Sequence, residues 1–368
     1  MTPYKHQLVL SGLRVLDLTR VLAGPLCTMM LGDLGADVVK VERPGTGDDT
    51  RGWGPPFDER GESAYFLSIN RNKKSMAADL SDPSDRAVVE SLITGADVVV
   101  DNFRRGMLDR YQLDAEQLLA KYPRLVWCTV SGFGADSDRP GYDYVVQAEC
   151  GWMAITGEAD GNPMKVGVAL ADVVAGKDAA IATLAALFAR ERTGRGRHVR
   201  TSLAQSATAA LVNVAQNALV TGREAERWGN AHPNLVPYEL FHARDRPIVI
   251  AVGNDSQWRA CVRALSLDGL AGDGILETNA GRVSNRARIV AAMAARVRER
   301  PATAWLTALE AAGVPCGVVR TVLEALRGTS ASALTGVGPS VPGVVRYPPP
   351  RLDEHGPMIR ERGWSVFA

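Results

Sequence analysis

The sequence predicts an α/β fold in which a parallel sheet carries helices on both faces. Short apolar segments alternate with helical segments throughout the first 130 residues, and this alternation is typical of strand–helix–strand units whose strands run parallel. The chain has 368 residues, of which 46% are hydrophobic, so it can bury the core of one large domain or of two. We expect two.

The N-terminal part supplies most of the predicted sheet. Residues 13–18 (LRVLDL) form a short apolar strand, and the AGP segment at 23–25 places a proline at the start of a helix that we expect to end near residue 34. Gly35 separates this helix from a second strand at 37–41, which Glu42 closes. Two further pairs of helix and strand are predicted, at 85–94 with 96–100 and at 115–121 with 125–130.

The rest of the chain is predicted to contain longer helices and a polar crossing between domains. An alanine-rich stretch at 171–190 keeps its larger apolar residues at helical spacing, and a second one covers 204–220 after a strand at 198–203. Residues 221–237 are polar and irregular, which indicates a linker. The other predicted elements are a strand at 248–252, helices at 257–265, 286–298 and 303–312, and a loop over 328–350 that is rich in Gly, Ser and Pro.

The composition excludes several classes of function. Lys and Arg together number 42 against 41 Asp and Glu, so the formal net charge of +1 provides no field that would attract a nucleic acid. The N-terminus lacks the pattern of a signal peptide, and no apolar stretch is long enough for a membrane helix. Five cysteines and five histidines are scattered without metal-ligand spacing, so we expect a reduced, cytoplasmic protein that holds no structural metal.

The opening strand, turn and helix imitate a dinucleotide-binding unit, but the glycine fingerprint of that unit is absent. Gly24 stands in AGP rather than in G-x-G-x-x-G, so the backbone lacks the further glycines that allow close approach to a pyrophosphate. We therefore expect a doubly wound sheet that binds no NAD or FAD.

Asp172 is the most suggestive carboxylate of the chain, because it is the lone charge in the apolar segment 166–174 (VGVALADVV) before a long helix. As an N-cap it would accept hydrogen bonds from free backbone N–H groups at the start of that helix. As a nucleophile it would have to be ionised, and a helix N-terminus favours the ionised form. The two roles are compatible, and the residue pattern alone leaves both open.

Several cations fall at or just beyond the ends of predicted strands. Ligands of parallel sheets bind outside the carboxyl ends of the strands, so these cations could converge on one anionic ligand, with Phe103 as a stacking face for a base. The alternative is an ordinary set of solvated surface charges. The cations are Arg43, Lys73, Lys74, Arg104, Arg105 and Arg110.

Nine segments, in order along the chain, resemble the class III CoA-transferases, the family of formyl-CoA transferase and carnitine CoA-transferase. Any one segment is a weak match, but nine in register over nearly the full length make a specific one. The segments are 12–17 (GLRVLD), 23–25 (AGP), 34–42 (LGADVVKVE), 49–51 (DTR), 70–75 (NRNKKS), 96–103 (ADVVVDNF), 131–134 (SGFG), 193–196 (TGRG) and 312–317 (AGVPCG).

The resemblance implies a Rossmann-like large domain built from both ends of the chain, a smaller α/β domain from its middle, and two chains interlocked as a homodimer. We accordingly expect residues 1–220 and the returning segment 328–368 in the large, CoA-binding domain. Residues 221–327 are expected to form the small domain.

The resemblance also implies that Asp172 is the nucleophile of a CoA transfer from an acyl-CoA thioester to a carboxylic acid, through a covalent aspartyl-CoA thioester. The segment 163–167 (PMKVG) leads to this aspartate as it does in the family. CoA and its thioesters are substrates, and no tightly bound cofactor is implied. By position, the expected CoA contacts are Leu22, Ala23, Arg43, Ala78, Asn102, Phe103, Arg104 and Arg110, with Tyr142 and Asp143 as further pocket residues.

Two departures from the family pattern bear on function. Ser81 replaces a lysine that often follows the pair at 79–80, so a phosphate contact is lost or is supplied by Lys73 or Lys74. The segment 228–233 (WGNAHP) lacks the glycine run that closes the site of formyl-CoA transferases, so formyl-CoA and oxalate are not expected substrates.

Two other functions remain open. The α-methylacyl-CoA racemases of the same family move an α-proton between two bases, and their His-Asp motif corresponds to Tyr142-Asp143 here. An unperturbed tyrosine has a pKa of about 10, which makes it a poor general base beside a histidine, so the transferase is preferred. The second alternative is a relative that binds acyl-CoA but has lost its activity.

Overall fold

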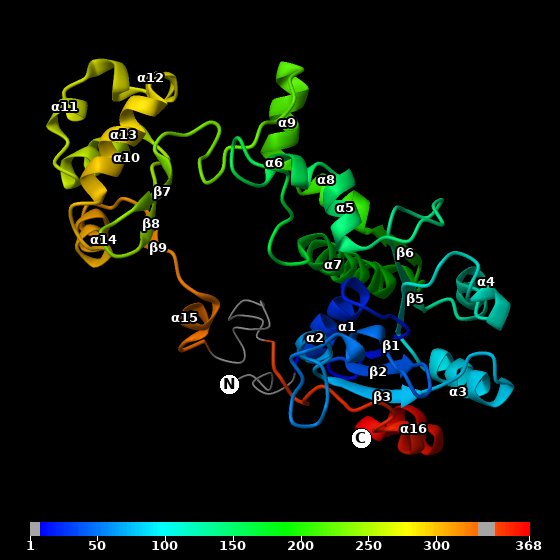
Figure 1. Ribbon diagram of the computed structural model, residues 1–368. Coiled ribbons are helices and arrows are strands. Elements are labelled where there is room, and N and C mark those ends of the chain that lie inside the picture. Colours follow the sequence, from blue (N-terminus) through cyan, green and yellow to red (C-terminus); the bar gives the residue numbers. More distant parts are fainter. Residues whose placement is uncertain (1–7, 330–342) are drawn as a thin grey trace, which may run out of the picture. The chain divides into compact units, whose positions relative to one another are not determined.

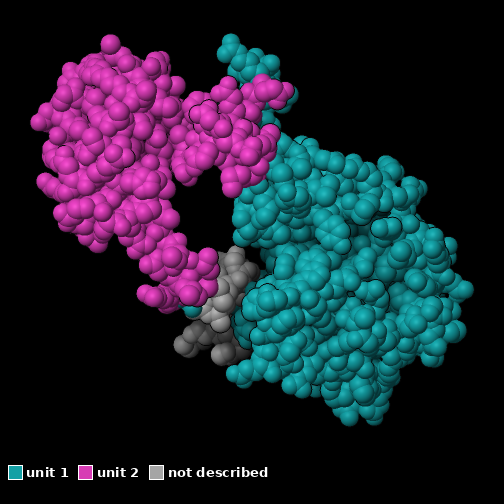
Figure 2. All heavy atoms as spheres, viewed as in Figure 1, with its two compact units in different colours: residues 1–153, 165–223, 329–368 teal, residues 154–164, 224–328 magenta. Residues whose placement is uncertain are grey.

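The computed structural model describes residues 8–329 and 343–368 and divides the chain into two compact units (Figure 2). The first unit comprises residues 1–153, 165–223 and 329–368, and the second comprises 154–164 and 224–328. Residues 154–164, which we expected in the large domain, lie in the second unit because Arg227 binds them. Its guanidinium donates hydrogen bonds to the carbonyls of Ala154, Glu158 and Gly161, at 3.2, 3.3 and 2.7 Å.

A six-stranded parallel sheet forms the centre of the first unit, as the sequence predicts (Figure 1). The strand order is β3-β2-β1-β4-β5-β6, which is the doubly wound arrangement with its switch point between β1 and β4. The strands are β1 (Arg14–Asp17), β2 (Asp37–Glu42), β3 (Lys73–Ala77), β4 (Val98–Asp101), β5 (Val126–Ser131) and β6 (His198–Ser202).

Each face of the sheet has its own helical cover, because alternate residues of a strand point to opposite sides. One face packs against α1 (Ala23–Asp33), α7 (Leu170–Thr193) and α8 (Leu203–Ala209) through strand residues such as Val15 and Val98. The other face packs against α3 (Pro83–Thr94), α4 (Ala115–Lys121) and α16 (Gly356–Arg362) through neighbours such as Leu16 and Val99. The two apolar cores explain why the neighbouring strands β4 and β5 are mostly apolar.

Small residues allow α7 to lie close to α1. Gly176 faces α1 so closely that a Cβ at this position would come within 2.6 Å of the carbonyl oxygen of Ala23. Most of the other buried residues of α7 are alanines. The alanine-rich composition therefore brings the N-terminal part of α7 next to the start of α1, which follows the carboxyl end of β1.

The stretch predicted as one helix over 204–220 is two helices, α8 and α9 (Val212–Thr221). The helix breaks because Val212 has a φ of +41°, a value that no right-handed helix accommodates. The remaining elements of the first unit are η1 (Asp49–Gly52), α2 (Ala64–Ile69), η2 (Asp109–Tyr111), α5 (Asp143–Glu149), α6 (Trp152–Ile155, shared with the second unit) and η5 (Gly363–Phe367).

The second unit packs helices on a small antiparallel sheet of order β7-β8-β9. Its core contains the fully buried Trp258 and Trp305, together with Ile248 and Ile250 of the central strand. The predicted strand and three helices of this region are present, but the two strands that flank the predicted one were not expected from the sequence. The elements are β7 (Tyr238–His242), β8 (Pro247–Ala251), α10 (Asp255–Ala264), α11 (Asp268–Ala271), η3 (Gly274–Glu277), α12 (Asn279–Ser284), α13 (Arg286–Val297), α14 (Ala302–Ala311), β9 (Cys316–Val318) and α15 (Val322–Leu326).

The C-terminal segment belongs to the first unit from residue 343 onward. The side chain of Asn72 donates to the carbonyl of Val344 at 2.7 Å, and the guanidinium of Arg51 donates to the carbonyl of Pro350 at 3.2 and 3.3 Å. The part of the predicted 328–350 loop at 330–342 lies outside the described residues. Among the residues that are described, no helix has the length and the apolar character that crossing a membrane requires.

Candidate active site

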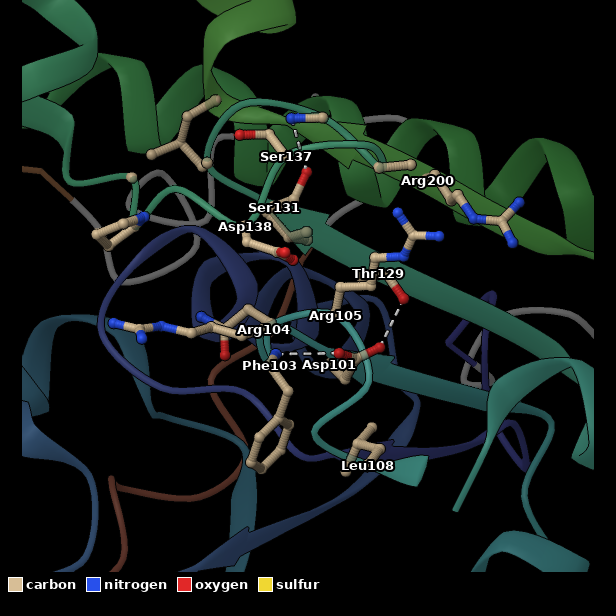
Figure 3. A pocket seen from close by; sticks show the side chains of 18 of the residues that line it. Asp101, Phe103, Arg104, Arg105, Leu108, Thr129, Ser131, Ser137, Asp138 and Arg200 are labelled. Carbon is tan, nitrogen blue, oxygen red and sulfur yellow. Dashed lines mark hydrogen bonds between the residues drawn. The ribbon is translucent and has the colours of Figure 1, made fainter. Parts of the chain in front are cut away.

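A pocket of about 710 Å³ opens at the carboxyl ends of β1, β4 and β5 in the first unit (Figure 3). Its walls come mainly from residues 20–23 after β1, 101–109 after β4 and 127–142 along and after β5. Asp172 of α7, His198 and Arg200 of β6, residues 114–116 and Leu203 also line it. This is the switch point of a doubly wound sheet, where two neighbouring strands send their following segments to opposite faces and leave a crevice.

Asp172 lies in the first turn of α7 and lines this pocket. It does not cap the helix, because α7 begins at Leu170 and Ala169 occupies the cap position, so the N-cap interpretation is wrong. The residue is 7% exposed, and burial together with the nearby charge of Asp143 raises the pKa of its carboxyl from 3.8 to about 7. Within the described residues no hydrogen-bond donor to this carboxylate is found.

Asp143 is the group that caps α7. One oxygen of its carboxylate accepts from the backbone N–H of Ala171 at 2.8 Å and from that of Asp172 at 3.4 Å. The other oxygen accepts from the side-chain amide of Gln147 at 2.6 Å. Gln147 in turn accepts from the backbone N–H of Val166 at 2.8 Å, so these two side chains hold the segment that leads into α7. Asp143 itself does not line the pocket, whereas its neighbour Tyr142 does.

Five of the expected CoA contacts lie together in the pocket. Asn102 closes one wall by accepting from the backbone N–H of Arg20 at 3.0 Å and donating to its carbonyl at 2.7 Å. Among the described residues, neither Arg104 nor its neighbour Arg105 forms an ion pair, so both guanidiniums are available to an anion. The five residues are Leu22, Ala23, Asn102, Phe103 and Arg104.

Three expected contacts lie outside this pocket. Arg43 is exposed and forms an ion pair with Asp49 at 2.7 Å, and the same carboxylate binds Arg20 of the pocket wall at 3.0 Å. Ala78 is buried directly after β3, and Arg110 belongs to η2. Arg43 is thus linked to the pocket through one shared carboxylate, whereas no such link is found for the other two.

Neither Lys73 nor Lys74 lines the pocket. The expectation that Lys73 supplies a phosphate contact is wrong. Both residues begin β3, so they lie at the amino end of the strand. The buried ammonium of Lys73 donates to Asp17, to Asn70 and to the carbonyl of Pro25, each at 2.9 Å, and these bonds use all three of its hydrogens. The ammonium of Lys74 lies over the rings of Tyr347 and Phe367.

The sequence analysis missed the group that forms the floor of the pocket. Asp101 ends β4 and is buried, and burial raises the pKa of its carboxyl. Its second oxygen accepts from the indole of Trp127 at 2.7 Å and from the hydroxyl of Thr129 at 2.6 Å. Thr129 in turn lies 2.9 Å from the Nε2 atom of His198. No local pattern could have shown this group, because the register of β4, β5 and β6 brings it together.

Comparison with known proteins agrees with these features. Residues 10–338 match the model of CoA-transferase family III. Succinyl-CoA:glutarate CoA-transferase of Mus musculus is 42% identical over 94% of this chain and 84% of its own length. Acetyl-CoA:oxalate CoA-transferase of Acetobacter aceti is 37% identical over 98% of this chain and 97% of its own.

A solved structure extends the likeness to the fold. The crystal structure of a CAIB/BAIF family protein from Brucella suis is 40% identical, with a TM-score of 0.83 over 97% of this chain and 99% of that one. The chain belongs to the class III CoA-transferase family and is a CoA-transferase.

Proposed function

We propose that this enzyme transfers CoA from an acyl-CoA thioester to a carboxylic acid through a covalent intermediate on Asp172. One contrast between two buried carboxylates of the pocket carries the proposal. Asp101 accepts three hydrogen bonds from the protein, so its oxygens are already occupied. Asp172 accepts none from any described residue, so its oxygens are left to attack an incoming carbonyl carbon.

The exchange needs four attacks and no proton. The Asp172 carboxylate attacks the thioester carbonyl, which forms a mixed anhydride and releases the CoA thiolate. The thiolate attacks the aspartyl carbonyl of the anhydride, which forms the aspartyl-CoA thioester and releases the donor acid as its carboxylate. The acceptor carboxylate and the thiolate then repeat both attacks in reverse, which yields the new acyl-CoA and regenerates Asp172. The free energy of the thioester bond is kept throughout.

The environment of Asp172 suits a nucleophile that must be both reactive and ionised. A carboxylate whose pKa is about 7 is more basic than an exposed one, and about half of it is ionised at neutral pH. The N–H groups of Ala171 and Asp172 are bound to Asp143, so they are not free to stabilise the oxyanion. We infer that other donors around the pocket serve that role.

We place the CoA moiety along the carboxyl ends of β1 and β4. Phe103 supplies an aromatic face, and the unpaired Arg104 supplies a charge-assisted donor to a phosphate oxygen. Arg43 is proposed as an outer phosphate contact because Asp49 joins it to Arg20 of the pocket wall. Contacts from Ala78 and Arg110 remain predictions of the family resemblance. Ser81 donates to Asp79 on the surface and does not line the pocket.

We propose short dicarboxylic acids and their CoA thioesters as substrates. The relatives whose names mention succinyl-CoA, glutarate and oxalate support this class. The exclusion of oxalate was based only on the absent glycine run at 228–233, and a relative that is 37% identical is named for oxalate, so oxalate returns to the panel of acceptors.

We further propose that the enzyme is a cytoplasmic homodimer whose chains interlock as in the family. Large apolar side chains remain exposed on two helices of the first unit, and monomers rarely leave such patches uncovered. None of the five cysteines forms a disulfide, which fits a reducing compartment. Light scattering after gel filtration tests the assembly. The exposed residues are Ile181 and Phe188 of α7 and Leu219 and Val220 of α9, which are 64, 69, 78 and 75% exposed.

The racemase remains a second candidate because a pKa of about 7 also suits a general base. Tyr142 lines the pocket but is 55% exposed, so it lacks the burial that would prepare it as a partner base. Incubation with an acyl-CoA in heavy water, without an acceptor acid, separates the two: deuterium at the α-carbon supports the racemase. We do not retain the inactive acyl-CoA binder, since pocket and nucleophile are both present.

The direct test is the Asp172→Asn variant. We expect it to lose CoA exchange between succinyl-CoA and glutarate while it still binds CoA. Asp178→Asn, on the same helix but outside the pocket lining, is the matched control and should keep its activity. Full exchange activity in Asp172→Asn would rule out the covalent mechanism.

A further inference from the structure

A chain of hydrogen bonds crosses the pocket floor from β4 to α4. The hydroxyl of Thr129 is directed at Asp101 and lies 2.6 Å from it (Figure 3), and the Nε2 atom of His198 lies 2.9 Å from the same hydroxyl. The Nδ1 atom of His198 lies 2.8 Å from Glu116, and Arg200 donates to the same oxygen of Glu116. Asp101 and Glu116 are thus joined through one threonine and one histidine.

This series of hydrogen bonds ends at Asp101, in the turn that we propose as a CoA contact. The first oxygen of Asp101 accepts from the backbone N–H of Phe103 at 3.0 Å, so the carboxylate sets the shape of the turn between β4 and Arg104. Asn102 of the same turn holds the backbone of Arg20 on the opposite wall. No hydrogen bond joins this group to Asp172 among the residues described. A disturbance of the chain should therefore change CoA binding and leave the chemical step intact.

The number of hydrogens in the chain defines the protonation of His198. Thr129 has one hydroxyl hydrogen, and an ionised Asp101 can only accept, so this hydrogen points to Asp101. Thr129 must then accept its second bond from an N–H at Nε2 of His198. The carboxylate of Glu116 likewise requires an N–H at Nδ1. With Asp101 and Glu116 both ionised, the two bonds exist together only when each ring nitrogen of His198 carries a hydrogen.

We propose that His198, held by Glu116, is a positioning residue for acyl-CoA, which directs the Thr129 hydroxyl onto Asp101 and thereby shapes the turn at 101–104. It does not touch the reacting atoms. The inference rests on the proposed function, since it assumes that CoA occupies this pocket. An Nε2 atom without a hydrogen would be an acceptor and would compete with Asp101 for the Thr129 hydrogen.

The test compares two substitutions of His198, one that replaces the ring nitrogen Nε2 with an amide and one that replaces Nδ1. His198→Gln places an uncharged N–H donor near the Nε2 position, and His198→Asn places its amide near Nδ1, out of reach of Thr129. Binding of free CoA is measured by calorimetry in the Asp172→Asn background, so that the titration of Asp172 does not contribute. Steady-state kcat and KM for succinyl-CoA are measured in the enzyme with Asp172 intact. Thr129→Val and Thr129→Ser provide a second pair with an unaltered histidine.

We expect His198→Asn and Thr129→Val to raise the Kd of CoA and the KM about tenfold, the effect of one lost hydrogen bond to a charged network, with kcat within about twofold. His198→Gln and Thr129→Ser should stay within about threefold of the parent.

Two results would overturn the inference. One is parental CoA affinity in His198→Asn, and the other is a fall of kcat at unchanged KM in that variant. If His198→Asn does not fold, the Thr129 pair decides by the same criteria. Absence of saturable CoA binding by the parent protein would instead overturn the proposed function, so the two failures are distinguishable.

Discussion

Asp143 binds the backbone of Asp172: its carboxylate accepts a hydrogen bond from the Asp172 N–H at 3.4 Å and a shorter one, 2.8 Å, from Ala171. The same carboxylate therefore caps α7, orients Asp172, the proposed nucleophile, and places a negative charge beside it. The favourable helix terminus and the unfavourable neighbouring charge act on Asp172 in opposite directions. Burial raises the pKa of Asp172, as the charge of Asp143 also does, and the pKa reaches about 7.

The pH dependence of the transfer follows from this arrangement. Only the ionised Asp172 attacks, so kcat/KM should fall below a pH of about 7, the pKa of this carboxyl in the free enzyme. Asp143→Asn removes the neighbouring charge and should move this acid limb about one unit lower, at a cost of ~1 kcal/mol in stability because Gln147 loses its acceptor. A pH–rate profile of kcat/KM for Asp143→Asn measures the shift of the acid limb. Glu361→Gln, at an exposed site, is the control, and an unmoved acid limb in Asp143→Asn would contradict the account.

Asp172 should also destabilise the folded protein at high pH. Its pKa is raised on folding, so the folded state binds the proton more tightly, and the free energy of unfolding falls as the pH rises from about 4 to about 7. At one pKa unit per ~1.4 kcal/mol, Asp172→Asn should be more stable than the parent by on the order of 2–4 kcal/mol at a pH of about 8, and by less at about 5. Thermal unfolding of both proteins at each pH measures the difference. Equal midpoints of thermal unfolding for the parent and Asp172→Asn at the higher pH would show that the ionised carboxylate does not destabilise the folded state.

The buried pair of Lys73 and Asp17 should contribute strongly to the stability of the first unit. Both side chains are fully buried and lie 2.9 Å apart. Lys73→Met removes the ion-pair partner of a buried carboxylate, to which Thr19 and Thr28 still donate, and should cost ~3–5 kcal/mol. Arg124→Met, which breaks the exposed pair with Glu191, should cost less than ~1 kcal/mol. Urea unfolding compares the two, and similar small losses would contradict the structural role given to Lys73.

The nucleotide end of CoA should depend on Phe103 and Arg104. Loss of a stacking face is worth ~1–3 kcal/mol, so Phe103→Ala should raise the KM for succinyl-CoA by roughly tenfold or more without changing kcat to the same degree. Arg104→Met should raise the KM as well, and this increase should shrink at high ionic strength because salt screens the contact with phosphate. Phe57→Ala, at a residue 48% exposed and outside the pocket lining, is the control. An unchanged KM in both pocket variants would place CoA elsewhere.

Local patterns predicted the parts of the fold that depend on neighbouring residues. The apolar strands and the alanine-rich helix α7 follow directly from periodicity, and Asp172 stands out as a charge within an apolar segment. The break at Val212 and the short strands β7 and β9 were missed, because packing rather than local propensity sets them.

The site was harder to predict, because its groups come from distant parts of the chain. The bond from Asp143 to α7 spans 29 residues, and the contact between His198 and Glu116 spans 82. Lys73 carries the same charge as Arg104 in the sequence, yet one is buried in the core and the other lines the pocket. Their positions along the strands distinguish them, because Lys73 begins β3 whereas Arg104 follows the carboxyl end of β4.

The most direct test of the central claim is mass spectrometry of peptides after incubation with succinyl-CoA and a trapping reagent. Hydroxylamine attacks the aspartyl carbonyl of the thioester, releases CoA and leaves a hydroxamate on the side chain. We predict a modification on the peptide that contains Asp172, dependent on succinyl-CoA and absent from Asp172→Asn. An enzyme that exchanges CoA with no modification at Asp172, or with one at another residue, would contradict the covalent mechanism.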